Sequence, residues 1–338
     1  MRVAFRVDGN NKIGIGHIMR CLSLADAFAQ HDVHVEFVLS DTIMQEIVER
    51  RGYSTYLLNS RWDDYSYGLS EFRTLLVDHS INWVITDSYY AQQEYFAEIH
   101  DFCKTAIISE GVPAAELCHV DLFINYNIYM NSFKPDHHNY KMCLGSDYAL
   151  LRSEYALLPE NQGDQILVLT GGSDPLNVAP NIVNGLYNKF QDKIKIAVVT
   201  SSLNPHLTEL ELLCGKRNVT VYVDTADMAS VMQKAKVAIS AGGSTLYELC
   251  ACGVPTITYS FVDNQLGNVN AYSQKNLMPY AGDFRCSPES VVANIVSACE
   301  DYLNGSKHLK EISQKLRILC DGAGAMRVAR EIIKMSGN

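Results

Sequence analysis

Short runs of β-branched and apolar residues alternate along this chain with segments of helical periodicity. This alternation predicts parallel strands joined by crossover helices, so that helices cover both faces of each sheet. In the first half the expected strands are Arg2–Val7, Val33–Leu39, Trp83–Thr86, Thr105–Ile108 and Leu122–Asn125. In the second half they are Ile166–Thr170, Ile194–Val199, Val219–Val223, Val237–Ser240 and Thr256–Tyr259. The expected fold class is therefore α/β.

Length divides these elements between two domains. A chain of 338 residues is too long for one domain of ordinary size. Its hydrophobic fraction of 47% can supply a core for each half. The polar segment from Pro159 to Asp164 is typical of a hinge. We expect two Rossmann-like domains that face each other across a cleft, residues 1–158 and 159–338, with packing of the terminal helix against the first domain left open.

The loops after the strands are the place to search for a site, because open parallel sheets bind ligands at the carboxyl ends of their strands. Five of these loops are polar or rich in glycine, and together they favour a cleft. The first half supplies the loop through Gly14, Gly16 and His17, and the segment Asp87-Ser88-Tyr89-Tyr90. The second half supplies Gly171-Gly172-Ser173-Asp174-Pro175, Gly242-Gly243-Ser244-Thr245 and Asp263-Asn264-Gln265.

His17 stands at the expected start of a helix that runs to about Gln30. Gly14 and Gly16 allow backbone N–H groups to approach a phosphate or a sugar closely, and the helix N-terminus adds positive potential. A histidine at this place has the residue type best suited to proton transfer near neutral pH. The alternatives are a tight turn and a capping or packing histidine. Met19 replaces the third glycine of a dinucleotide-binding loop, which disfavours that ligand.

The second half has its own glycine loops for an anion. Gly243, Ser244 and Thr245 at a helix start would offer N–H groups and hydroxyls to a diphosphate. Glu248, one turn later, would accept hydrogen bonds from ribose hydroxyls or, alternatively, stabilise the first helical turn. In the segment Gly171–Pro175 we expect a glycine turn, a candidate N-cap residue and, in Pro175, a proline suited to a first helical turn. Neither glycine loop has the spacing of an ATP-splitting P-loop.

Composition excludes several classes of partner. The net charge is −10, with no dense basic block, which disfavours nucleic acid. No stretch approaches the ~18 apolar residues of a membrane span, so we expect no membrane partner and a cytoplasmic location. The ten cysteines are dispersed without a Cys-x-x-Cys pair and are expected to be reduced core thiols. His137 and His138 are interpreted as a solvated loop pair. We expect no metal and no cofactor.

Taken in order, these segments resemble proteins of the glycosyltransferase-B architecture, which include the lipid II-forming N-acetylglucosaminyltransferase. They are more similar to the UDP-sugar hydrolases of pseudaminic acid biosynthesis and to spore-coat polysaccharide proteins. One departure is Ser88, where the hydrolases have histidine. The matching segments are Arg6–Asp8, Ile13–Cys21, Asp87–Tyr89, Gly145–Tyr155, Gly171–Asp174, Asn264–Gln265 and, in the longer relatives, Asp321–Ala325.

This resemblance implies hydrolysis of a UDP-linked 2,4-diacetamido-2,4,6-trideoxy sugar. Water would attack the anomeric carbon with inversion and release UDP and the free sugar, without a metal. His17 would be the general base, with Tyr89 and Asn264 beside the sugar. A monomer or weak dimer is expected. The residues expected to bind substrate or nucleotide are Gly14, Gly16, Arg20, Gly171, Gly172, Gly243, Ser244, Thr245, Glu248 and Gln265.

Three other functions stay open at the level of sequence. A UDP-sugar-dependent glycosyltransferase would use the same scaffold with an acceptor hydroxyl in place of water. A nucleotide-sugar-binding module would leave His17 without a task. A sugar 2-epimerase is a further possibility on this architecture. Tyr90 or Tyr126 could take the role expected of Tyr89, because the chain contains 19 tyrosines.

Overall fold

The computed structural model forms two compact units. The first unit comprises Met1–Ser153 together with Gly322–Asn338, and the second comprises Glu154–Asp321. The first segment of the first unit thus ends at Ser153 rather than at residue 158. Its second segment contains the last helix of the chain. The structure describes all residues except 11, 114–116, 135–138, 162, 215–217 and 338. His137, His138 and the hinge residue Gln162 therefore lie outside the described residues.

The first unit is built on a sheet of seven parallel strands in the order β3-β2-β1-β4-β5-β6-β7. The five strands expected from the sequence are all present. The edge strands β3 and β7 were not expected, because each has only four residues and neither is fully buried. The strands are β1 (Arg2–Val7), β2 (His34–Leu39), β3 (Ser54–Leu57), β4 (Trp83–Asp87), β5 (Lys104–Ile108), β6 (Leu122–Asn125) and β7 (Lys141–Leu144).

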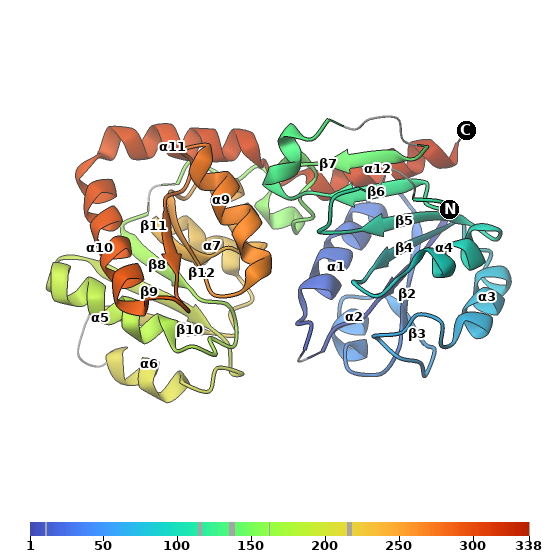
Figure 1. Ribbon diagram of the computed structural model, residues 1–338, viewed down its shortest axis with the longest axis horizontal. Coiled ribbons are helices and arrows are strands. Elements are labelled where there is room, and N and C mark those ends of the chain that lie inside the picture. The colour runs from blue at the N-terminus through green and yellow to red at the C-terminus, as the bar shows by residue number, and fades with distance from the viewer. Residues whose placement is uncertain (11, 114–116, 135–138, 162, 215–217, 338) are drawn as a thin grey trace. The chain divides into compact units, whose positions relative to one another are not determined.

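Helices cover both faces of this sheet (Figure 1). On one face, the core side chains of α3 and α4 pack on Ala4, Val84 and Ile107 of the central strands. On the other face, α1 packs against α12. The helices of this unit are α1 (Gly16–Ala29), α2 (Gln45–Arg50), α3 (Leu69–Asp78), α4 (Gln93–His100) and α12 (Gly324–Ser336), with 3-10 turns at Ile128–Ser132 and Ser146–Tyr148.

The second unit repeats the pattern with six parallel strands in the order β10-β9-β8-β11-β12-β13. The α/β fold class with two parallel-sheet units is therefore confirmed. The strands are β8 (Gln165–Leu169), β9 (Lys195–Thr200), β10 (Val219–Val223), β11 (Ala235–Ala241), β12 (Thr256–Ser260) and β13 (Tyr280–Asp283). The helices are α5 (Val178–Phe190), α6 (Leu207–Cys214), α7 (Met228–Gln233), α8 (Thr245–Cys252), α9 (Leu266–Gln274), α10 (Pro288–Asn304) and α11 (Ser306–Leu319).

One local prediction in this unit was wrong. Pro175 does not lie in the first turn of a helix, because α5 begins only at Val178. Asp174 nevertheless caps that helix, since its carboxylate accepts the N–H groups of Val178 and Ala179 at 2.8 and 2.9 Å. The three residues between the cap and the helix form a turn that the sequence pattern does not reveal.

The strand order places a switch point in each sheet. In the first unit, β1 lies between β2 and β4, so the chain leaves it in opposite directions across the sheet. In the second unit, β8 lies between β9 and β11 in the same way. Ligands of open α/β sheets bind at such points, outside the carboxyl ends of the strands. The loops after β1, β4, β8 and β11 are therefore the first places to examine.

The last helix is held firmly in the first unit. Val328, Ala329 and Ile332 of α12 are fully buried, and the indole N–H of Trp83 donates to Ser336 Oγ at 2.7 Å. The red helix α12 accordingly lies among blue and green elements in Figure 1. At its start, a Cβ added to Gly324 would lie 2.3 Å from the carbonyl oxygen of Ala149. Only glycine fits this close approach of two backbones.

Within the described chain, no helix has the length and apolar character needed to cross a bilayer.

We expect Gly324→Ala to destabilise the protein by about 1–3 kcal/mol, because the new methyl group overlaps backbone atoms that have no rotamer in which to move aside. The midpoint of urea unfolding measures this change. Gly337→Ala is the matched control, since a Cβ there would meet no atom within 4 Å. Equal midpoints for the two variants would contradict the close packing of α12.

Candidate functional site

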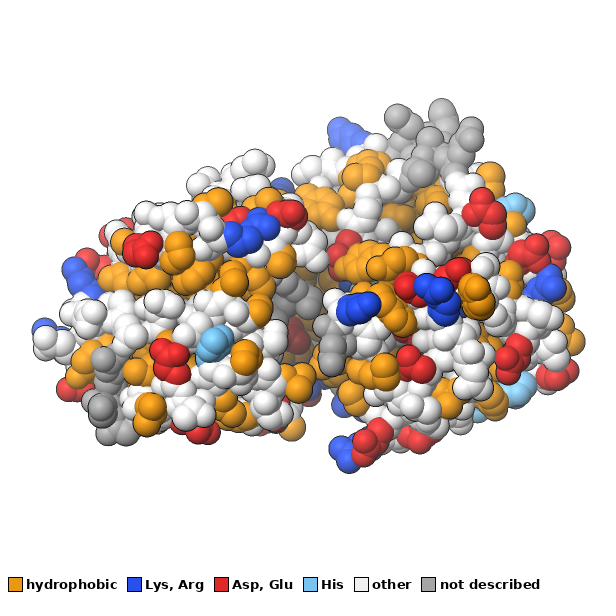
Figure 2. All heavy atoms as spheres, turned by 60° about the horizontal axis from the view of Figure 1, so that its bottom comes forward, with side chains coloured by type: hydrophobic (Ala, Val, Ile, Leu, Met, Phe, Trp, Pro, Cys, Tyr) orange, Lys and Arg blue, Asp and Glu red, His pale blue; other side chains and the backbone are white. Residues whose placement is uncertain are grey.

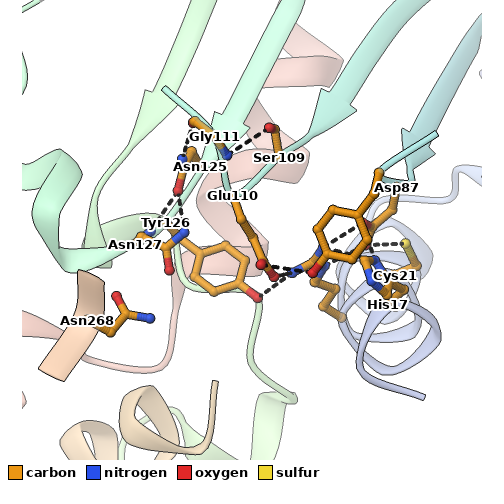
Figure 3. Close-up of polar contacts among 12 residues, drawn as sticks. His17, Cys21, Asp87, Ser109, Glu110, Gly111, Asn125, Tyr126, Asn127 and Asn268 are labelled. Atoms are coloured by element: carbon orange, nitrogen blue, oxygen red, sulfur yellow. Dashed lines mark hydrogen bonds and ion pairs between the residues drawn. The ribbon is translucent and has the colours of Figure 1, made fainter. Parts of the chain in front are cut away.

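The centre of the candidate site is a buried contact between His17 and Asp87. His17 is the second residue of α1, which follows β1, and Asp87 is the last residue of the neighbouring strand β4. His17 Nδ1 lies 2.6 Å from Asp87 Oδ1, and the two residues are 5% and 1% exposed. Figure 3 shows both side chains turned toward each other, with Cys21 beside them. The fold thus brings together two residues that are 70 positions apart.

Arg20 closes this contact from one helical turn further along α1. Its Nε and one terminal nitrogen donate to the two oxygens of Asp87 at 2.5 and 2.6 Å, a bidentate arrangement. Burial alone would favour the neutral acid, but the charges and hydrogen bonds of Arg20 and His17 outweigh it and lower the pKa of Asp87 to about 2. Asp87 is therefore ionised at neutral pH.

The ionised carboxylate determines which imidazole nitrogen carries the proton. An Arg20 nitrogen also lies 3.0 Å from His17 Nδ1, so in principle Nδ1 could accept from Arg20 instead. An ionised carboxylate, however, has no proton to give, so the 2.6 Å contact with Asp87 requires Nδ1 to be the donor. The lone pair of the neutral ring then lies on Nε2. This is the form in which a histidine takes a proton from another molecule.

Tyr89 and Glu110 extend the cluster. Glu110 follows β5, and it accepts from Arg20 at 3.0 Å and from the Tyr89 hydroxyl at 2.9 Å. The ring of Tyr89 stands edge-on to His17, with centroids 4.9 Å apart. Burial, together with the charge of Glu110, raises the pKa of Tyr89, so its hydroxyl stays a donor. Arg20 also reaches the hydroxyl of Tyr126 at 3.4 Å (Figure 3).

The structure therefore brings together three residues that the sequence singled out, namely His17, Arg20 and Tyr89. Sequence reasoning assigned no role to Asp87 or Glu110. The signal for Asp87 was present, because it ends the strand beside β1, where Val7 pairs with it in register. Glu110 gave a weaker signal, since it is a lone acidic residue in the loop after β5.

The glycines before α1 differ in what they offer. Gly14 has φ +74°, and its N–H donates to the Asn10 carbonyl at 2.7 Å, so this donor serves the loop itself. Gly16 is exposed and begins α1, and no neighbouring atom lies within 4 Å of the place where a Cβ would be. A Cβ at Gly14 would meet no neighbouring atom within 4 Å either, so the two glycines differ in the hydrogen bond of Gly14 and not in the space around them.

The remaining predicted residues lie at the carboxyl edge of the sheet in the second unit. Exposed Gly171 has φ +80°, and the carbonyl of Gly172 accepts the Ser201 hydroxyl at 2.8 Å. Gly243 and the exposed Ser244 precede α8. Thr245 is the first residue of that helix, and Glu248 lies in its first turn.

The loop after β12 contains the last two predicted residues. Asn264 is exposed, whereas Gln265 is buried, with its side-chain oxygen accepting the N–H of Phe261 at 2.9 Å. Gln265 thus uses that oxygen to close its own turn.

Charged side chains of both signs are interspersed on the face that Figure 2 shows, with Lys and Arg beside Asp and Glu.

Among the described residues, no group of three or more His, Cys, Asp or Glu side chains could hold a metal ion. In the same part of the chain, none of the ten cysteines forms a disulfide, and Cys21, Cys250 and Cys299 are examples of those that are buried.

Comparison with known proteins agrees with the architecture. Residues 166–315 match the model of the glycosyltransferase family 28 C-terminal domain. The crystal structure of Acinetobacter baumannii MurG superposes with a TM-score of 0.72 at 14% identity, covering 99% of this chain and 100% of that one. The fold is therefore of the glycosyltransferase-B type.

Curated relatives carry the names that the sequence motifs suggest. The UDP-2,4-diacetamido-2,4,6-trideoxy-beta-L-altropyranose hydrolase of Campylobacter jejuni is 26% identical, covering 78% of this chain and 93% of its own length. The spore coat polysaccharide biosynthesis protein SpsG of Bacillus subtilis is 25% identical, covering 97% and 96%. Protein MJ1062 of Methanocaldococcus jannaschii is 24% identical over 76% of this chain, which spans only 55% of that relative's length. The resemblance stated from the motifs is confirmed.

We expect Asp87→Asn to destabilise the protein by about 3–5 kcal/mol at neutral pH, because it removes the buried carboxylate that holds Arg20 with two hydrogen bonds and leaves Arg20 only the partly exposed Glu110 as a counter-charge. The native pKa of Asp87, about 2, is lower than its ordinary value of 3.8. Its ionisation therefore stabilises the fold fully above about pH 4, and this contribution is lost as pH falls toward 2. Urea unfolding should show that the free energies of unfolding of Asp87→Asn and of the parent protein become more similar as pH falls from about 4 toward 2.

The control for this experiment is Asp63→Asn, which breaks an exposed ion pair with Arg61 in the same unit. It should shift the midpoint far less than Asp87→Asn does. If the free energies of unfolding of Asp87→Asn and the parent protein differ by the same amount at every pH, the assigned ionisation of Asp87 is contradicted.

Proposed function

We propose that this chain hydrolyses a UDP-linked 2,4-diacetamido-2,4,6-trideoxy sugar to UDP and the free sugar. The reaction would serve nonulosonic (pseudaminic) acid or surface polysaccharide biosynthesis. The observation that carries the proposal is the 2.6 Å contact between His17 Nδ1 and the ionised Asp87. The name of the Campylobacter relative supports the choice of substrate.

In the proposed reaction His17 is the general base. Nε2 takes a proton from water while the water oxygen attacks the anomeric carbon, and the bond to the UDP oxygen breaks. The ring becomes an imidazolium, and Asp87, which already accepts from Nδ1, stabilises that charge. Base catalysis of this kind contributes about 10²–10⁴ in rate. Attack from the side opposite UDP gives an inverted sugar.

Arg20 and Glu110 act on this chemistry through other residues. Arg20 keeps Asp87 ionised by donating two hydrogen bonds to it. Glu110 accepts hydrogen bonds from Arg20 and from the Tyr89 hydroxyl. We propose that Tyr89, which is 51% exposed, contacts the sugar from this fixed position.

The second unit would bind the nucleotide. UDP is a good leaving group, so its departure requires stabilisation of negative charge rather than a strong acid. We assign three sets of groups to the diphosphate. They are the N–H groups at the start of α8, the hydroxyls of Ser244 and Thr245, and the loop at Gly171 and Gly172. Glu248 is assigned to the ribose and Asn264 to the sugar. These groups need no metal, so activity should persist in EDTA.

A glycosyltransferase is the second candidate, because the fold is that of MurG and other sugar transferases. The same base would then deprotonate an acceptor hydroxyl instead of water. The two functions differ in what happens when no acceptor is present.

The test is incubation with the UDP-sugar alone. We expect equal amounts of UDP and free sugar, and we expect His17→Asn to lower kcat about 10²–10⁴-fold with a small change in KM. His31→Asn, which changes an exposed histidine beyond the end of α1, should leave kcat unchanged. Turnover that depends on an added acceptor would assign the chain to the transferases. Normal turnover by His17→Asn would reduce His17 to a packing residue.

A further inference from the structure

An aromatic pair includes Tyr90, three residues after Asp87, and has no task in the reaction described above. The rings of Trp62 and Tyr90 meet edge to face, with centroids 5.4 Å apart and planes at 88°. Trp62 is partly exposed, and Tyr90 is 39% exposed. Large aromatic side chains held at the surface beside a catalytic group are typical of ligand contacts.

The strand that supplies Asp87 also positions one half of this pair. After β4 ends at Asp87, Ser88 Oγ accepts the N–H of Tyr90 at 3.0 Å and tightens the turn. Consecutive residues then have different partners, because Tyr89 stands against His17 and Tyr90 stands against Trp62. One peptide bond therefore joins Tyr90 of the aromatic pair to Tyr89, the residue that packs on His17.

The loop between β3 and α3 fixes the other half. Tyr65 in this loop is buried in the core, where Arg6 lies over its ring at 4.3 Å and Tyr95 meets it edge-on. Trp62, three residues earlier in the same loop, is partly exposed. The ammonium of Lys12, from the loop that leads to Gly14, lies 5.6 Å from the centre of the Trp62 ring. Trp62 thus contacts both loops that flank His17.

We propose that Trp62 and Tyr90 form a wall that binds the apolar part of the sugar and selects for it. The proposal rests on the proposed function, since it takes that UDP-sugar as the ligand. A 6-deoxy sugar with acetamido groups presents methyl groups that lose contact with water against aromatic rings, whereas a sugar with a 6-hydroxyl would lose a hydrogen bond to water there. The wall would therefore favour the deoxy, diacetamido sugar over UDP-N-acetylglucosamine.

Trp62 supplies a direct probe of this contact. The chain has two tryptophans, and the other one, Trp83, is fully buried in β4. In a His17→Asn background, which prevents turnover, we expect the UDP-linked diacetamido sugar to change tryptophan fluorescence and UDP alone to leave it unchanged. The change should vanish when Trp62→Phe is added, while the dissociation constant, measured by calorimetry, stays close to that of the parent.

Trp62→Ala should raise the dissociation constant for the diacetamido sugar nucleotide about threefold to tenfold, the equivalent of one aromatic contact. It should leave the dissociation constant for UDP unchanged and reduce the preference for the diacetamido sugar nucleotide over UDP-N-acetylglucosamine. Tyr67→Ala is the matched control, because Tyr67 is an exposed aromatic residue of the same loop whose ring partner is Arg61.

Equal effects of Trp62→Ala and Tyr67→Ala, or a fluorescence change with UDP alone, would overturn the wall as a sugar contact. An unchanged dissociation constant combined with a raised KM for an acceptor would overturn it too, in favour of an acceptor surface. Turnover by the unmutated protein is measured separately. Its absence would contradict the proposed hydrolysis, whereas the fluorescence titration would still decide whether Trp62 contacts the sugar.

Discussion

The candidate site depends on one buried carboxylate. Asp87 accepts from His17 and from two nitrogens of Arg20, so a strand end and a helix start are joined by three hydrogen bonds. A buried charge is tolerated only when it is paired and hydrogen-bonded, and Arg20 meets this need. The same contacts place the histidine proton on Nδ1. Fold stability and the protonation state of His17 therefore have a common origin.

The sequence predicted the architecture well and the site in part. Alternating strand and helix patterns located ten strands to within a residue or two at each end, because buried parallel strands are continuous apolar runs. It missed β3, β7 and β13, which have four residues each and occupy sheet edges. Edge strands are only partly buried, so their sequences lack that signal. The position of the last helix could not be predicted either, since it depends on a packing contact between Gly324 and Ala149.

Within the site, residue type singled out His17 and the family resemblance singled out Arg20 and Tyr89, but the pairings came only from the fold. Asp87 follows an apolar strand like many aspartates, and its role depends on β4 lying beside β1. Gln265 illustrates the opposite case. Its place in a polar loop suggested a ligand contact, yet its side-chain oxygen closes its own turn. A polar residue in a loop can stabilise the loop as readily as it can bind a substrate.

The architecture is shared with sugar transferases, so the fold alone does not determine which bond breaks. We propose that His17, oriented by Asp87, directs water to the anomeric carbon. Reaction in ¹⁸O-labelled water, analysed by mass spectrometry and by NMR of the first sugar anomer formed, shows which bond the water attacks. We expect label in the sugar alone, with inverted configuration. Label in UDP or in UMP would contradict it, because the attack would then be at phosphorus.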